Sequence, residues 1–143
     1  MASPTYMGSA DPARSRRDYG DYYPEWLNNL ADDVTTEGSL FDGAIEGPEA
    51  VKALIGAVRT LYEHQEFNFA GPYGDNGFLE DYTARVRGEP LGSAVLITSN
   101  AAGQTQHVAV NYRPRSSLLL VSRLLGEHFA GTPYAEYFLA GES

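Results

Sequence analysis

The sequence predicts an α+β fold in which helices come first and an antiparallel sheet follows. Residues 91–114 read as two strands joined by a short turn, because the second strand alternates apolar and polar side chains. Residues 47–62 instead place apolar side chains at helical spacing, which predicts an amphipathic helix. Helices followed by a meander of strands are typical of a bent sheet with helices on its concave side.

The composition of the 143-residue chain limits the partners that it can have. A formal net charge of −9 argues against a nucleic acid or an anionic membrane as partner, since both require a basic surface. No apolar run approaches the roughly 20 residues of a membrane span. The absence of cysteine excludes disulfides, thiol catalysis and cysteine-ligated metal. We therefore expect a cytoplasmic protein without a signal peptide and without a cofactor.

A single domain is expected over residues 13–130, between two peripheral segments. Residues 1–12 are small and polar and predict a flexible arm. An arginine-rich stretch at residues 13–19 predicts a short helix. Residues 131–143 predict a tail that is anchored by three aromatic side chains, Tyr134, Tyr137 and Phe138.

A second short helix is predicted for residues 23–30, where Trp26 and Leu30 lie four residues apart and share one face. The acidic pair Asp32-Asp33 is interpreted as the turn that ends this helix. A brief strand is predicted directly after it, at residues 34–37, and residues 38–47 are interpreted as an irregular loop.

The clearest helix begins at Gly47-Pro48-Glu49, with proline at the first helical position and an acid in the first turn. Its apolar stripe continues to Tyr62, which places His64 at its C-terminal end. Dense turn chemistry marks residues 71–77. The sheet is expected to contain four further strands, at residues 67–69, 78–87, 91–100 and 104–114.

The last helix is predicted at about residues 116–129, with Ser116 or Ser117 as its cap. Its leucine-rich surface suits either packing on the sheet or a subunit interface.

Three short motifs connect this order of elements with a known family: ADDV-TTEG at residues 31–38, GPEAVKALI at residues 47–55 and VAVNYRP at residues 108–114. Together they resemble the nuclear transport factor 2-like superfamily, within it the SnoaL-like and ketosteroid-isomerase-like group, over about residues 22–114. The resemblance implies a cone-shaped, strongly curved mixed or antiparallel sheet with helices on its concave face. It also implies one apolar pocket and a homodimer.

At the positions where that family has its catalytic residues, this chain has residues without acidic or hydroxyl side chains. The carboxylate base of the isomerases falls at Gly38, the second carboxylate at Val95 and the tyrosine of the second helix at Leu30. None of these side chains can take a proton or hold an enolate oxygen. An alignment that slips by one residue would recruit Glu37 or Ser93 instead.

The resemblance also implies that the inward faces of the helices and strands line a pocket with a few hydroxyl groups. An apolar cavity with few polar groups is typical of a ligand site, although the same residues also suit a plain core. The expected lining is Trp26, Leu30, Ile55, Val58, Tyr62, Tyr82, Ala84, Val86, Val95, Ile97, Val108, Val110 and Tyr112.

Two functions follow from this pocket, together with a weaker accessory role in binding a protein partner. The first is the binding of a small hydrophobic molecule without catalysis, since the usual carboxylates are missing. The alternative is a polyketide cyclase-, isomerase- or epoxide-hydrolase-like enzyme, in which a buried tyrosine hydroxyl donates to a ligand carbonyl. Its candidate catalytic residues are Tyr62, His64, Tyr82 and Tyr112.

The three histidines have separate interpretations. His64, flanked by acids, is either a general base or a cation at a helix C-terminus. His107 is expected on the face opposite the pocket, and His128 near the end of the last helix. Neither has metal-ligand spacing with any acid, so no metal site is predicted.

Overall fold

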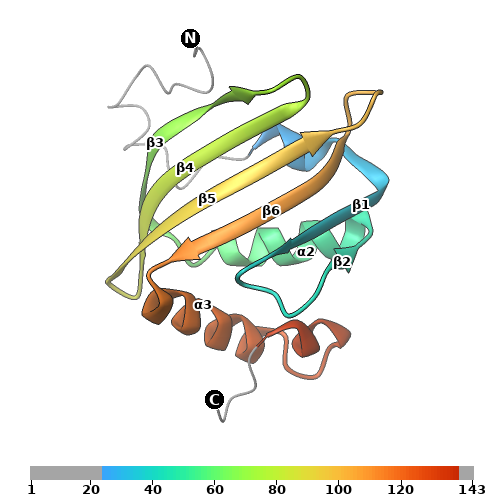
Figure 1. Cartoon of the computed structure of the whole chain (residues 1–143). Helices are drawn as coiled ribbons and strands as arrows, with labels where there is room; N and C mark the ends of the chain where they lie inside the picture. Colours follow the sequence, from blue (N-terminus) through green and yellow to red (C-terminus); the bar gives the residue numbers. More distant parts are fainter. Residues whose placement is uncertain (1–23, 139–143) are drawn as a thin grey trace.

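The computed structural model describes residues 24–138, which form one curved sheet with helices packed against it (Figure 1). The predicted arm at residues 1–12 and the predicted helix at residues 13–19 lie outside the described residues. The predicted α+β class is confirmed. The elements, with two short 3-10 helices labelled η, are η3 (Glu25–Asn28), β1 (Leu30–Gly38), β2 (Ile45–Glu46), α2 (Pro48–Arg59), β3 (Glu63–Tyr73), β4 (Gly77–Val86), β5 (Glu89–Ser99), β6 (Thr105–Arg113), α3 (Arg115–His128) and η4 (Pro133–Tyr137).

The six strands form one sheet in the order β2-β1-β6-β5-β4-β3. The meander from β3 to β6 is antiparallel throughout, whereas β1 pairs with β6 in parallel, so that the sheet is mixed. Figure 1 shows the sheet curving over α2, with α3 near the lower end of β6. This arrangement confirms the expected curved, mixed sheet with helix packing on its concave side and a further helix at the C-terminal end, and it shows that the sheet is open (Figure 1).

The core lies between α2 and the concave face of the sheet. On β6 the predicted alternation is observed, since Val108, Val110 and Tyr112 are buried while Arg113 is exposed. On α2 the apolar stripe faces the sheet and buries Val51, Leu54, Ile55 and Val58. Burial of each such side chain stabilises the fold by about 1.5–3 kcal/mol relative to exposure.

The predicted helix at residues 23–30 is wrong beyond its first turn. Only the single turn η3 forms, and Leu30 already begins β1, which also contains the acidic pair Asp32-Asp33. The main-chain amide of Thr105 donates to the carbonyl of Asn29, so the chain is drawn into the sheet at this point. Hydrogen bonds to β6 therefore override the local helical pattern.

The helix α2 is shorter than predicted, and β3 is longer. The helix ends at Arg59, where the hydroxyl of Thr60 donates to the carbonyl of Ala57. Tyr62 consequently follows the helix, and His64 lies in β3 instead of at a helix C-terminus. The strand also continues through Tyr73, into the segment that the sequence marked as a turn.

Two expectations about the C-terminal part also differ from the structure. Neither Ser116 nor Ser117 caps α3; the hydroxyl of Ser117 donates instead to the carbonyl of Pro90 on β5. Within the described part of the segment expected to be a tail, Pro133–Tyr137 form η4, and the expected anchor Phe138 is buried against Phe129 and Phe41. In the part of the chain that the structure describes, no helix is both long and apolar enough to cross a membrane.

Candidate functional site

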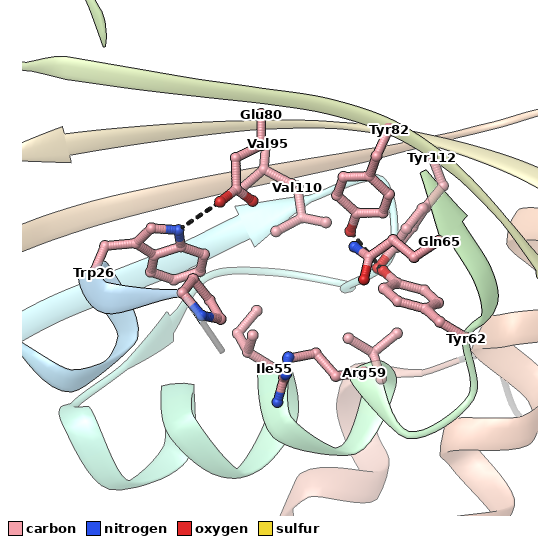
Figure 2. A pocket seen from close by; sticks show the side chains of 12 residues that line it. Trp26, Ile55, Arg59, Tyr62, Gln65, Glu80, Tyr82, Val95, Val110 and Tyr112 are labelled. Carbon is pink, nitrogen blue, oxygen red and sulfur yellow. Dashed lines mark hydrogen bonds between the residues drawn. The ribbon is translucent and has the colours of Figure 1, made fainter. Parts of the chain in front are cut away.

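A small cavity lies under the curved sheet, between the end of α2, the start of β3 and the concave faces of β4, β5 and β6 (Figure 2). Its volume is about 30 Å³, which is room for about two water molecules. The turn η3 closes one side of it. The lining residues are Pro24, Trp26, Ile55, Val58, Arg59, Tyr62, Gln65, Glu80, Tyr82, Val95, Val110 and Tyr112.

Most of the residues that the sequence assigned to a pocket lie around this cavity. They are Trp26, Ile55, Val58, Tyr62, Tyr82, Val95, Val110 and Tyr112. The cavity lining does not include Leu30, Ala84, Val86, Ile97 or Val108. Ile97 and Val108 belong to the buried core, and Leu30 packs against that core at the start of β1.

Three tyrosines meet at one end of the cavity. The hydroxyl of Tyr62 lies 2.7 Å from that of Tyr82 and 2.5 Å from that of Tyr112. Tyr82 on β4 and Tyr112 on β6 both pair with Ser93 on the intervening strand β5, so all three side chains share the concave face. Serine between two tyrosines leaves space for both rings, and Tyr62 reaches this space from the end of α2.

The tyrosine cluster, defined as Tyr62, Tyr82 and Tyr112, has one hydrogen left to donate. Three hydroxyl groups carry three hydrogens, and the two hydrogen bonds within the cluster use two of them. The third has three alternative acceptors, because the phenols of Tyr82 and Tyr112 also interact with each other: the neighbouring phenol, Ser93 or an acceptor in the cavity. The cluster can therefore bind one oxygen atom of a ligand as a hydrogen-bond donor.

Burial keeps the cluster protonated. It raises the pKa of Tyr82 to about 12, an effect that the Ser93 hydroxyl opposes and the Glu80 carboxylate reinforces. Desolvation is also the largest cause that raises the pKa of Tyr62 and of Tyr112, followed by the neighbouring phenols. All three side chains are thus neutral donors at neutral pH.

Ser93 stands out beneath the cluster. Its side chain is fully buried, and its hydroxyl makes no hydrogen bond of ordinary geometry within the described residues, although it lies near the Tyr82 phenol. Leaving a buried hydroxyl unsatisfied costs about 1–3 kcal/mol. A small adjustment of the cluster would let Ser93 take part in its hydrogen bonds.

A carboxylate lies at the other end of the cavity. Glu80 is only 3% exposed, and its Oε2 accepts a hydrogen bond of 3.1 Å from the indole Nε1 of Trp26. Glu80 on β4 pairs with Val95 on β5, which in turn pairs with Val110 on β6. The two valines are consequently an apolar floor beside the acid.

No carboxylate was predicted in the cavity, so Glu80 was missed. The signal was present, because Glu80 precedes Tyr82 by two residues and must share its face of β4. Gln65 and Arg59 were also missed. Gln65 lies within the first irregularity of the β3–β4 register, between Glu63 and Glu66, and Arg59 comes from the last turn of α2.

The structure brings three of the four candidate catalytic residues together and separates the fourth. His64 is exposed on β3 and lines a different, open groove. His107 lies outside the cavity, where its Nδ1 is 2.6 Å from the Thr35 hydroxyl and its Nε2 is 3.1 Å from Glu37. Within residues 24–138, no cluster of three histidine or acidic side chains is arranged to hold a metal ion.

The chain matches no family model and no curated protein. It does match solved structures by fold. An uncharacterised protein with a cystatin-like fold from Silicibacter pomeroyi has a TM-score of 0.71 and 18% identity, with 90% of this chain and 92% of that one covered. A steroid delta-isomerase from Pseudomonas aeruginosa has a TM-score of 0.70 and 17% identity, with 90% and 96% covered.

A third solved structure is similar at a lower TM-score. An NTF-2 like protein of unknown function from Burkholderia xenovorans has a TM-score of 0.53 and 16% identity, with 76% of this chain and 88% of that one covered. At such identities the similarity establishes the fold alone.

Proposed function

Since the chain has the fold of the nuclear transport factor 2-like superfamily, we propose that its cavity binds a small, mainly apolar carbonyl compound and catalyses proton transfer beside the carbonyl. The observation that carries this proposal is that one cavity contains both a carboxylate that can act as a base and a hydrogen-bond donor. Glu80 supplies a buried carboxylate, and the tyrosine cluster supplies one donor hydrogen. One fold neighbour is a steroid delta-isomerase, which supports the same class of reaction.

The proposed chemistry uses each group for one task. The carboxylate of Glu80 takes a proton from the carbon next to the carbonyl, and the electron pair moves onto the carbonyl oxygen. The hydrogen that the tyrosine cluster has to spare stabilises the resulting enolate oxygen. The protonated Glu80 then returns the proton at the far end of the conjugated system. Atoms balance, and the product is an isomer of the substrate.

The position of the groups suits this division of labour. Glu80 and Tyr82 are two residues apart on one face of β4, a separation of about 7 Å between their Cα atoms. The apolar floor of Val95 and Val110 lies beside them, which excludes water from a bound ring and strengthens the polar contacts at both ends.

A simple ketone tests the proposal. The β,γ-unsaturated cyclohexenone should be converted to its conjugated isomer, and the near-ultraviolet absorbance of the product measures the rate. Glu80→Gln should lower the rate by about 100-fold or more, and Tyr62→Phe should lower it as well. Glu127→Gln removes an exposed carboxylate of α3 instead and should leave the rate unchanged.

The alternative role as a plain binding protein has a distinct outcome. Binding of the ketone by calorimetry, with no isomerisation and no deuterium exchange beside the carbonyl in heavy water, would establish binding without catalysis. If the protein neither binds nor converts the ketone, and Glu80→Gln changes nothing, the proposal is wrong for this class of compound.

A further inference from the structure

The indole of Trp26 occupies one end of the cavity. Figure 2 shows Trp26 and Glu80 at one end and the tyrosine cluster at the other, with Val95 and Val110 along the space between them. The indole N–H donates to Glu80 over 3.1 Å, so the acid that the proposed function requires is already engaged by a neutral donor. A ligand that places its own donor on Oε2 of Glu80 must take the place of the indole N–H.

The cavity is too small for a ring unless one lining side chain moves. Its volume of about 30 Å³ holds about two water molecules, whereas a cavity that accepts benzene has a volume of about 150 Å³. Val95 and Val110 are buried on strands with a neighbour on each side. Tyr62 is held by two hydrogen bonds within the tyrosine cluster.

Trp26 is a lining residue that is placed to move. Its side chain is half-buried, in contrast to Glu80 and the valines, and its indole N–H makes one hydrogen bond. Its main chain is fixed, because the Thr105 hydroxyl donates to the Trp26 carbonyl over 2.9 Å and the next residue, Leu27, is only 1% exposed. Rotation of the indole therefore enlarges the cavity without unfolding the turn η3.

On the basis of the proposed function, we propose that Trp26 is a specificity-determining residue, whose indole N–H competes with the ligand for Glu80. The ligands selected are planar rings with an oxygen acceptor that points to the tyrosine cluster and a proton donor, either O–H or the acidic C–H of the conjugated carbonyl system, that points to Glu80. The acceptor meets the tyrosine cluster, and the donor replaces the indole at Glu80. A hydrocarbon ring of equal size offers no such replacement, so it leaves Trp26 in place.

The competition also decides which donor lies on the acid. While the indole is bound, Oε2 of Glu80 accepts from an N–H that is not the proton to be transferred. Arrival of the ligand removes the indole and presents the proton to be transferred in its place. Oε2 of Glu80 thus receives the proton to be transferred only from a ligand that has displaced the indole.

Intrinsic fluorescence reports directly on this residue, because Trp26 is the single tryptophan of the chain. In the unliganded protein, Glu80→Leu removes the acceptor and should make the indole more accessible to acrylamide quenching than it is in wild type. Equal quenching in both proteins would overturn the competition. This measurement needs no ligand, so it stands even if the proposed reaction is absent.

Ligand titrations test the specificity. The conjugated cyclohexenone should shift the Trp26 emission to the red, as the indole moves into water, while cyclohexene should not. Trp26→Phe keeps an aromatic ring without the N–H, and calorimetry should show about threefold to tenfold tighter binding of the enone. Binding that leaves the emission unchanged, or weaker binding by Trp26→Phe, would contradict the inference while the proposed function survives. If the enone shifts the emission to the red but no isomerisation occurs, the inference about Trp26 holds and the proposed catalysis is wrong.

Discussion

Gly38 lies so close to the main chain of Val110 that no Cβ atom fits between them, and its φ of 147° disfavours any other residue. The two residues are partners in the parallel pairing of β1 with β6. This is the position at which the resemblance places the carboxylate base of the family's isomerases. A side chain there is incompatible with the pairing of these strands.

Gly38→Ala should accordingly destabilise the protein by about 3 kcal/mol or more, since backbone strain and a steric clash add together. Gly38→Asp should be at least as damaging and should yield no new base. Urea denaturation measures both effects. Gly43→Ala is the matched control, because Gly43 has a φ of 110° but open space around it, and it should cost only about 1–2 kcal/mol. A folded, active Gly38→Asp variant would disprove this account.

The tyrosine cluster should contribute measurably to stability. Tyr62→Phe removes both of its hydrogen bonds and leaves the hydroxyls of Tyr82 and Tyr112 without their shared partner, at an expected cost of about 2–3 kcal/mol. Thermal and urea unfolding measure this change. Tyr73→Phe, at a side chain that is 43% exposed, should alter stability by less than about 0.5 kcal/mol. Equal effects of the two substitutions would indicate that water satisfies the cluster.

The protein should lose stability in alkaline solution, and Tyr82 accounts for part of the loss. Below about pH 10 the phenol is protonated in both the folded and the unfolded state and contributes no pH dependence. Between about pH 10 and pH 12 it ionises in the unfolded state first, because its folded pKa is raised to about 12. The free energy of unfolding should fall by up to about 3 kcal/mol over this range from Tyr82 alone.

Urea denaturation across this pH range checks the sign and the size of that effect. Tyr82→Phe should have a shallower decline of stability with pH than wild type. An identical decline in the two proteins would show that Tyr82 ionises in the folded state without penalty.

The C-terminal anchor should be as important as a core residue. Phe138 is 6% exposed and stacks on Phe129 with the ring planes 5° apart and the centroids 6.0 Å apart. Phe138→Ala should therefore cost about 3 kcal/mol, measured by thermal unfolding. Phe69→Ala removes an aromatic ring that is 46% exposed and should cost far less. A comparable loss from both substitutions would contradict the role of Phe138 in the core.

The elements that are determined by residues close together in the sequence could be predicted from the sequence. The strands β4, β5 and β6 and the helices α2 and α3 lie close to their predicted positions, because local alternation and helical spacing determine them. The strand β1 could not be predicted at its full length. Its pairing with β6 is a tertiary property, and the residues from Leu30 onward follow the hydrogen bonds of Thr105 rather than their own pattern.

The residues of the candidate site also fall into those that the local sequence pattern predicts and those that it does not. The alternation that places Tyr82 on the concave face also places Glu80 there, so this acid was predictable from the same pattern. Gln65 was not predictable. The register between β3 and β4 shifts on both sides of Glu66, and His64 has a positive φ of 57°, so the alternation is interrupted where Gln65 turns inward.

The parallel pairing of β1 with β6 has a consequence for how the molecule folds. Short turns connect the strands of the meander from β3 to β6. By contrast, the hydrogen bond from the Thr36 hydroxyl to the Val108 carbonyl joins residues that are 72 positions apart in the chain. Loop closure over such a separation costs entropy before any contact repays it. We therefore expect the meander to form first and β1 to join it last, together with the adjoining turn η3. The tyrosine end of the cavity would then be in place before Trp26 arrives, and the slowest folding step would be the one that completes the site.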